Sequence, residues 1–274
     1  MYSRPEIARL EELRQAVGTA EISPETLEFP SGGWATYDYP GSWSNQAVGL
    51  GLSGEASESE LDQLVAFYTS RGVEPRVELA PFAHASVRDG LYERGFRLRE
   101  FGNVMARHLT PDEDLQAALS HPLPDGYEVA WIDPDDDDLL RECVTTACRG
   151  FIPEGTDPDE DMLGMGLRCA KYPRCDTYAV THEGRVVGSG AMESAAPVAG
   201  LFGASVLSDH RRRGIQAALI AARLERAREK GCKVACIHSE PGIPTERNAE
   251  RLGFFLAYTK VVLTLPGEGL VPSP

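Results

Sequence analysis

The first 110 residues alternate between helical and strand-like patterns of apolar positions. Apolar residues recur every three or four positions in separate stretches, which predicts helices at 5–18, 57–71 and 84–94. Shorter apolar or alternating runs lie around these stretches and predict strands at 34–39, 45–52, 75–80 and 96–107. Helices and strands in turn are typical of an α/β or α+β domain.

A polar, proline-rich stretch at 111–126 interrupts this order and predicts a linker between two domains, 1–110 and 127–274. Beyond the linker, apolar runs predict strands at 127–132, 177–182, 185–193, 198–207, 233–238 and 254–265. Helical spacing predicts helices from about 137 to 149 and at 158–171, 214–230 and 244–252. We interpret the acidic run at 133–138 as a helix start, where carboxylates meet the positive end of the dipole, rather than as a metal cluster.

Two segments of the chain resemble each other. RGVEPRVELAPFAHASVRDGLYERGF (71–96) and KGCKVACIHSEPGIPTERNAERLGF (230–254) both run from a basic residue and glycine through a strand, a proline and a short helix to Gly-Phe. A repeated strand–helix–strand unit predicts two similar domains in tandem, each a mixed, mostly antiparallel sheet flanked by helices. Chance similarity is the alternative interpretation.

Charge and composition narrow the class of protein. The formal net charge is −15, which argues against a general binder of nucleic acids or anionic membranes. We find no apolar run of membrane-spanning length and no signal-peptide core at the N-terminus, so we expect a cytoplasmic protein. None of the histidines has metal-ligand spacing with a partner, so we expect no metal.

The most informative stretch is His210 to Ile220, HRRRGIQAALI, which puts three arginines into an acidic chain. It lies between the strand at 198–207 and the helix that starts at 214, so it delivers a helix N-terminus with unpaired N–H groups. Such an end, with arginines beside it and a glycine that allows close approach, is an anion site that suits phosphate. The segment contains neither a Walker loop nor a G-x-G-x-x-G fingerprint.

This segment resembles the acyl-CoA-binding segment of the GNAT (Gcn5-related) N-acetyltransferase superfamily, whose signature is Gln/Arg-x-x-Gly-x-Gly/Ala. Arg211 stands at the first position and Gly214 at the fourth, but Gln216 replaces the usual small residue at the sixth. Ala217, which follows, is small. Asn248 and Leu252-Gly253-Phe254 come later in the family order, so the resemblance covers about 127–265.

The resemblance implies acetyl-CoA as co-substrate. The strand at 198–207 would splay from the strand at 233–238, and the pantetheine arm would pair with backbone groups in the gap like an added strand. Backbone amides of the loop and the helix start would hold the pyrophosphate. The implied cofactor-binding residues are Ala204, Ser205, Val206, Arg211, Arg212, Arg213, Gly214, Ile215, Gln216, Ala217 and Asn248. The Gln216 side chain would either narrow the pyrophosphate cradle or place an amide beside a phosphate.

The corresponding segment of the first domain, 49–58, lacks arginine. The helix that follows begins among acids at Glu55, Glu58 and Glu60, and carboxylates repel a pyrophosphate. We therefore expect the first domain not to bind CoA and to have a supporting or substrate-shaping role.

The catalytic residues are less well defined than the cofactor loop. The strand at 198–207 has no carboxylate, so Glu193, with Glu240 and His238 as alternatives, is the candidate base. Ala249 occupies the position of the family's frequent tyrosine acid, and Tyr258 on the last strand is the candidate in its place. Each of these side chains also has a purely structural interpretation, as does Tyr92 in the first copy.

These features predict an acetyl-CoA-dependent N-acetyltransferase in which an amine of a small molecule or peptide attacks the thioester directly. No cysteine has a nearby histidine to suggest an acyl-enzyme. A non-catalytic acyl-CoA-binding or regulatory module is the alternative, supported by the missing carboxylate and tyrosine. The sequence identifies no acceptor and leaves homodimer formation open.

Overall fold

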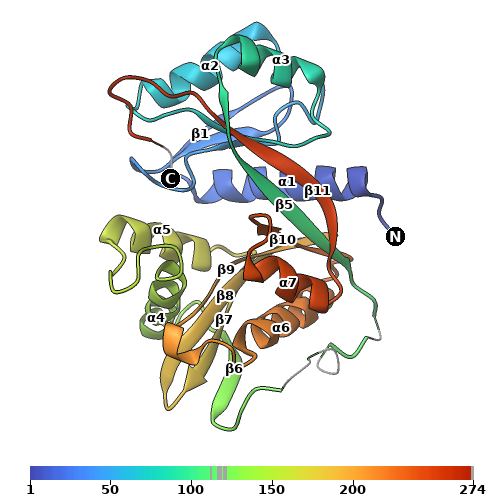
Figure 1. Ribbon diagram of the computed structural model, residues 1–274, viewed down its shortest axis with the longest axis vertical. Coiled ribbons are helices and arrows are strands. Elements are labelled where there is room, and N and C mark those ends of the chain that lie inside the picture. The colour runs from blue at the N-terminus through green and yellow to red at the C-terminus, as the bar shows by residue number, and fades with distance from the viewer. Residues whose placement is uncertain (112, 116–118, 120–121, 273–274) are drawn as a thin grey trace. The chain divides into compact units, whose positions relative to one another are not determined.

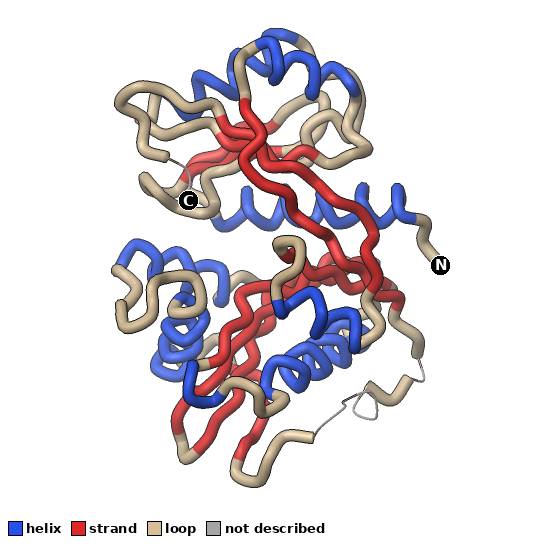
Figure 2. Tube along the Cα trace, viewed as in Figure 1, coloured by secondary structure: helices blue, strands red, loops and turns tan. Residues whose placement is uncertain are grey.

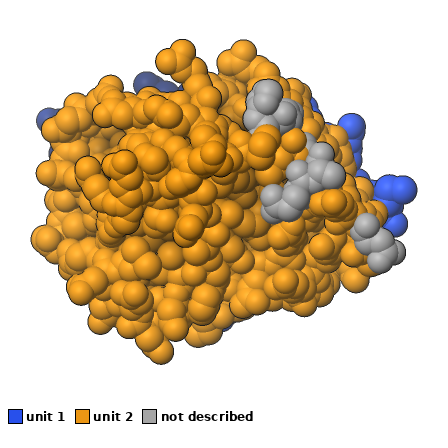
Figure 3. All heavy atoms as spheres, turned by 90° about the horizontal axis from the view of Figure 1, so that it is seen from below, with its two compact units in different colours: residues 1–104, 256–274 blue, residues 105–255 orange. Residues whose placement is uncertain are grey.

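The computed structural model describes residues 1–111, 113–115, 119 and 122–272 and shows a mixed α/β protein (Figures 1 and 2). It divides into two compact units, coloured separately in Figure 3. Unit 1 comprises Met1–Val104 and Leu256–Pro274, and unit 2 comprises Met105–Phe255. The predicted linker at 111–126 includes positions that lie outside the described residues.

Unit 1 is a mixed sheet with helices on both faces (Figure 1). Its helices are α1 (Arg4–Ile22), α2 (Glu58–Thr69) and α3 (Ala85–Glu93). Its strands are β1 (Glu25–Glu28), β2 (Trp34–Tyr37), β3 (Ala47–Val48), β4 (Arg76–Leu79), the first part of β5 (Arg97–His108) and β11 (Phe255–Thr264). They lie in the order β1-β2-β3-β4-β11-β5. The apolar faces of α2 and α3 pack on this sheet through Leu61, Leu64, Val87 and Leu91, all fully buried.

Unit 2 has the order β5-β10-β9-β8-β7-β6. Its strands are β6 (Tyr127–Ile132), β7 (Cys175–His182), β8 (Arg185–Ala195), β9 (Val198–Val206) and β10 (Val234–Ser239), with the end of β5. Its helices are α4 (Asp137–Cys148), α5 (Glu160–Ala170), α6 (Ile215–Glu229) and α7 (Pro244–Arg251), with a 3-10 turn η1 (Ser208–His210). Helices α4 and α5 cover one face of the sheet and α6 and α7 the other (Figure 1).

The acidic run at 133–138 begins a helix, as predicted. The Asp136 side chain accepts a hydrogen bond from the Leu139 N–H (3.1 Å), and Asp137 and Asp138 lie in the first turn of α4. This is an N-cap with acids at the positive end of the helix dipole. The predicted strands at 177–182 and 185–193 form an antiparallel hairpin, β7 and β8, and the turn residues Glu183 and Gly184 both have positive φ.

Both repeated segments fold as strand, helix and strand. The last strand of each repeat, β5 or β11, extends into the unit formed mainly by the other half of the chain. Strand β11 pairs antiparallel with β4, with Val261 opposite Leu79, so 256–274 belong to unit 1 and not with 127–255. The end of β5 belongs to unit 2, where the Leu109 N–H donates to the Lys233 carbonyl (2.9 Å). Apolar patterns predict each strand but not which copy of the repeat it pairs with.

Candidate active site

Strands β9 and β10 run together and then separate. They pair in parallel from Val198 and Val234 as far as Leu201 and Ile237, where the pairing ends. Beyond Leu201, β9 continues beside β8, with Ser205 opposite Ser189. The predicted splay of these strands is therefore present, and it leaves one edge of β9 without its β10 neighbour.

A β-bulge accompanies the separation. Ser189 lies opposite Ser205 but Ala191 lies opposite Phe202, so β9 has one residue more than β8 between these pairs. Within the bulge, Gly203 has a φ of +60°, a left-handed conformation that glycine adopts without a steric penalty. A bulge bends its strand, and this one lies where β9 leaves β10.

The turn after β9 ends in an uncapped helix start. Arg212 and Gly214 both have positive φ, at 62° and 81°. The first hydrogen bond inside α6 runs from the Ala218 N–H to the Gly214 carbonyl (3.0 Å), so the N–H groups of Ile215, Gln216 and Ala217 have no partner within the helix. No side chain caps this end and no acid lies in its first turn. Such a helix start, with open backbone donors and the positive end of the helix dipole, is suited to an anion.

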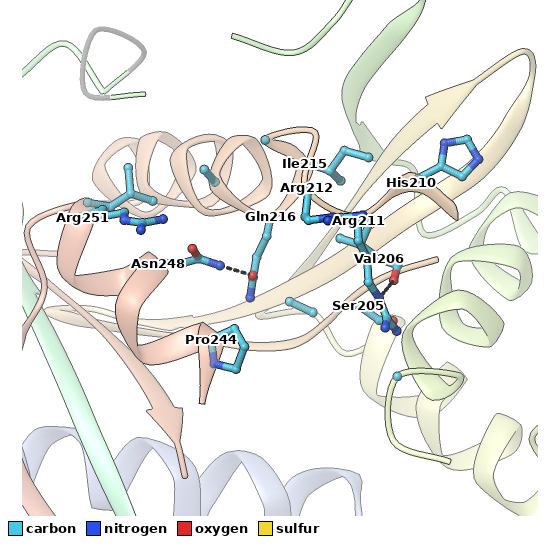
Figure 4. A pocket seen from close by; sticks show the side chains of 15 residues that line it. Ser205, Val206, His210, Arg211, Arg212, Ile215, Gln216, Pro244, Asn248 and Arg251 are labelled. Carbon is cyan, nitrogen blue, oxygen red and sulfur yellow. Dashed lines mark hydrogen bonds between the residues drawn. The ribbon is translucent and has the colours of Figure 1, made fainter. Parts of the chain in front are cut away.

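A cavity of about 690 Å³ opens at this helix start (Figure 4). Its size lies in the range of small-molecule sites. All the predicted cofactor-binding residues except Arg213 line it. Its other lining residues, which were not predicted to bind the cofactor, are Gly150, His210, Pro244, Arg251 and Leu252.

The segment that forms this cavity matches a known protein family. Residues 128–254, which include the diverging strands, the arginine turn and α7, match the family model described as "Acetyltransferase (GNAT) family". This match identifies a GNAT acetyltransferase domain at residues 128–254. GNAT enzymes use acetyl-CoA as co-substrate and act on amine acceptors. No curated protein matches the chain in sequence.

Solved structures of GNAT proteins share the fold. The chain is similar to a GCN5-related N-acetyltransferase from Kribbella flavida, at 19% identity and a TM-score of 0.67, with 95% of this chain and 96% of that chain covered. It is also similar to a tandem GNAT protein from the clavulanic acid biosynthesis pathway, at 13% identity and a TM-score of 0.61, with 97% and 98% covered. The predicted fold class, two GNAT-like domains in tandem, is confirmed.

Gln216, which replaces the usual small residue at the sixth position of the GNAT signature, has a structural role in this chain. The Gln216 side chain extends from the first turn of α6 to α7, where its Nε2 donates to Thr245 Oγ1 (3.3 Å) and its Oε1 accepts from Asn248 Nδ2 (Figure 4). A glycine or alanine at this position has no side chain that reaches so far. Gln216 therefore connects the two helices along the wall of the cavity.

A buried arginine holds the bulge of the GNAT domain against α6. Nη1 of Arg223 donates to the Ala191 carbonyl (2.8 Å) and the Phe202 carbonyl (3.3 Å), the facing pair at one end of the bulge. It leaves no room at Gly190, where a Cβ would lie 3.0 Å from the Arg223 Cζ. Burial lowers the pKa of Arg223 to about 10, which leaves it protonated at neutral pH.

An aromatic cluster supports the arginine turn from outside the cavity. The Tyr127 hydroxyl lies 2.8 Å from Nδ1 of His210, and its ring stacks on His182 with centroids 4.1 Å apart. The Arg213 guanidinium lies 5.9 Å from the centroid of the Tyr127 ring. Arg213 is thus turned toward this cluster, while Arg211 and Arg212 line the cavity.

The corresponding helix of unit 1, α2, begins differently from α6. The Glu60 carboxylate accepts hydrogen bonds from the N–H groups of Ser57 (2.8 Å) and Ser31 (2.8 Å), and Ser57 caps the helix in turn. Burial raises the pKa of Glu60, but these hydrogen bonds outweigh it and hold the pKa below its ordinary value of 4.5. The start of α2 therefore has a carboxylate where α6 has open N–H donors.

The predicted catalytic residues lie apart from the lining of the cavity. Glu193 is buried on β8, with Oε1 3.0 Å from Nη2 of Arg174. Tyr258 belongs to unit 1, where it is buried and its hydroxyl donates to Oε1 of Glu12 (2.7 Å). The described residues that line the cavity include no carboxylate and no tyrosine.

The alternatives for the base lie at the end of β10. His238 is half-buried and Glu240 is exposed just beyond the strand. Ala249, at the position of the family's frequent tyrosine, is fully buried in the core. Among the residues that the structure describes, no group of three or more His, Cys, Asp or Glu side chains is placed to hold a metal ion, and no helix is long and apolar enough to cross a membrane.

Proposed function

We propose that this protein is an acetyl-CoA-dependent N-acetyltransferase in which unit 2 binds acetyl-CoA and an amine acceptor attacks the thioester directly. One observation carries the proposal. A single cavity joins the open N-terminus of α6 to the edge of β9 that β10 has left, so phosphate donors and a strand edge face the same space.

Each part of the cavity suits one part of the cofactor. The N–H groups at the start of α6, with Arg211 and Arg212, suit the pyrophosphate. The backbone of Ala204 to Val206 suits the pantetheine arm as an added strand. In this orientation the thioester would lie toward the point where Leu201 and Ile237 diverge.

The reaction needs few groups from the protein. The nitrogen of a neutral amine forms a bond to the carbonyl carbon, the C–S bond breaks, and the amine proton is transferred to solvent or a side chain while the thiolate gains one. Glu193 and Tyr258 would have to leave Arg174 and Glu12 to take part. Loss of turnover in Glu193→Gln or Tyr258→Phe at unchanged CoA affinity would assign them this role, and unchanged turnover would exclude it.

A non-catalytic acyl-CoA-binding module is the second candidate, because the lining of the cavity has no carboxylate or tyrosine among its described residues. Calorimetric titration with CoA, combined with thiol release from acetyl-CoA in the presence of a panel of small and peptidic amines, separates the two. We expect CoA binding and amine-dependent thiol release. Binding without turnover on any amine would favour the module, and absence of CoA binding would refute both.

A further inference from the structure

The side chains of Asn248, Gln216 and Thr245 form a directed chain of hydrogen bonds between α7 and α6. Asn248 Nδ2 donates to Gln216 Oε1, and Gln216 Nε2 donates to Thr245 Oγ1 (3.3 Å). Gln216 and Asn248 line the cavity, and Figure 4 shows their amides pointing toward each other. Thr245, in the first turn of α7, is half-buried and does not belong to the lining.

This chain fixes the direction of both amides. Gln216 uses its oxygen on Asn248 and one N–H on Thr245, which leaves its second N–H as a donor. Asn248 uses an N–H on Gln216, which leaves its Oδ1 as an acceptor. The wall of the cavity therefore offers a donor on Gln216 and an acceptor on Asn248.

A donor beside an acceptor is the complement of a secondary amide, whose carbonyl accepts and whose N–H donates. We propose that Gln216 and Asn248 together recognise an amide of the pantetheine arm, and that Thr245 is a positioning residue that holds the Gln216 amide in the required orientation. The inference rests on the proposed function, since it takes acyl-CoA as the ligand. Under this proposal the Gln216 side chain contributes to recognition of the ligand, whereas the glycine or alanine usual at this position has no side-chain group that could do so.

Two probes separate this role from contact with phosphate. CoA contains the pantetheine amides, whereas adenosine 3′-phosphate 5′-diphosphate has the same phosphates and lacks them. Affinity of the full chain for both probes is measured by calorimetry for the wild type and for Gln216→Ala, Thr245→Val and Thr245→Ser. Thr245→Val removes the hydroxyl with little change of shape, and Thr245→Ser is its matched control because it retains the hydroxyl.

We expect Gln216→Ala to weaken CoA binding about tenfold and Thr245→Val about threefold, since each loses or misdirects about one hydrogen bond. Affinity for the nucleotide should stay at the wild-type value in both variants, and Thr245→Ser should match the wild type with both probes. Circular dichroism and the unfolding midpoint establish that each variant is folded. If Gln216→Ala does not fold, the comparison of Thr245→Val with Thr245→Ser tests the proposal without it.

Three results would overturn the proposal. If Gln216→Ala bound CoA and the nucleotide more weakly by the same factor, the Gln216 side chain would act on the phosphates or on the shape of the loop. A Thr245→Ser variant as weak as Thr245→Val would mean that the methyl group, and not the hydroxyl, matters. Unchanged CoA affinity in Gln216→Ala would exclude recognition by this side chain. A wild-type protein that binds neither probe would instead refute the proposed function, and this inference with it.

Discussion

The hydroxyl of Tyr127, at the start of β6, is hydrogen-bonded to Nδ1 of His210, in the turn that precedes the arginine loop. Because His210 lines the cavity, this bond fixes the loop from behind. We expect Tyr127→Phe to weaken CoA binding about fivefold through loss of one hydrogen bond, while the stacking on His182 stays. Calorimetry measures the effect, and Tyr92→Phe, at an exposed position of unit 1, is the control. Wild-type affinity in Tyr127→Phe would contradict the role of this bond.

The adjacent arginines should differ in their contributions to cofactor binding. Arg212 lines the cavity, whereas Arg213 lies against the Tyr127 ring. Charge-assisted hydrogen bonds to phosphate contribute about 2 kcal/mol, so we expect Arg212→Gln to weaken CoA binding about thirtyfold and Arg213→Gln by a factor of about three or less. Titrations at several salt concentrations should show a shallower salt dependence for Arg212→Gln alone. Equal losses in the two variants would contradict the division of roles.

Arg223 should be important for stability as well as for binding. Arg223→Met removes the guanidinium that joins the Ala191 and Phe202 carbonyls at one end of the bulge, and leaves both partly buried carbonyls without this donor. We expect a loss of about 3 kcal/mol in the free energy of unfolding, and a raised KM for acetyl-CoA because β9 is no longer held in place. Denaturant titration and steady-state kinetics test this. Arg223→Lys keeps the charge but has no second nitrogen to replace Nε, which donates to the Leu219 carbonyl while Nη1 donates to the other two, so it should recover only part of the loss.

The capping carboxylate of α2 should make the stability of unit 1 depend on pH. The pKa of Glu60 is below 4.5 in the folded protein, so the unfolded chain binds more protons at this site as the pH falls between the two values. The stabilisation is complete above about pH 4.5 and disappears as the pH falls through the lowered pKa. We expect Glu60→Gln to remove this part of the acid dependence. Hydrogen exchange of α2 amides at pH 3 to 6 measures it, and Ser57→Ala should cost about 1 kcal/mol at neutral pH. An unchanged acid profile in Glu60→Gln would contradict the assignment.

Much of the fold follows from local patterns. The helices and most strands lie where the spacing of apolar residues predicts them, with ends shifted by a few residues. Strand β1 gave no such signal, because Glu25–Glu28 is a short, mostly exposed edge strand without a clear alternation. The arginine turn and the helix start after it could be predicted because they lie in one continuous stretch around Arg211 and Gly214.

The rest of the site depends on contacts that no local pattern encodes. Gly150, just after α4, and Pro244, at the start of α7, reach the cavity from separate elements. Arg223 lies in a helix whose other buried residues are apolar, and nothing in its spacing shows that it is a buried link to the bulge. The side-chain bonds of Gln216 became visible only once α7 was placed beside α6.

The pairing of β11 with β4 means that the two halves of the sequence cannot be separated as independent products. A chain that stops at residue 255 leaves β4 with an unpaired edge, which is a site for aggregation. During synthesis, the first half leaves the ribosome long before the strand that completes its sheet. The sheet of unit 1 therefore cannot be completed until β11 has been synthesised, after the residues of unit 2.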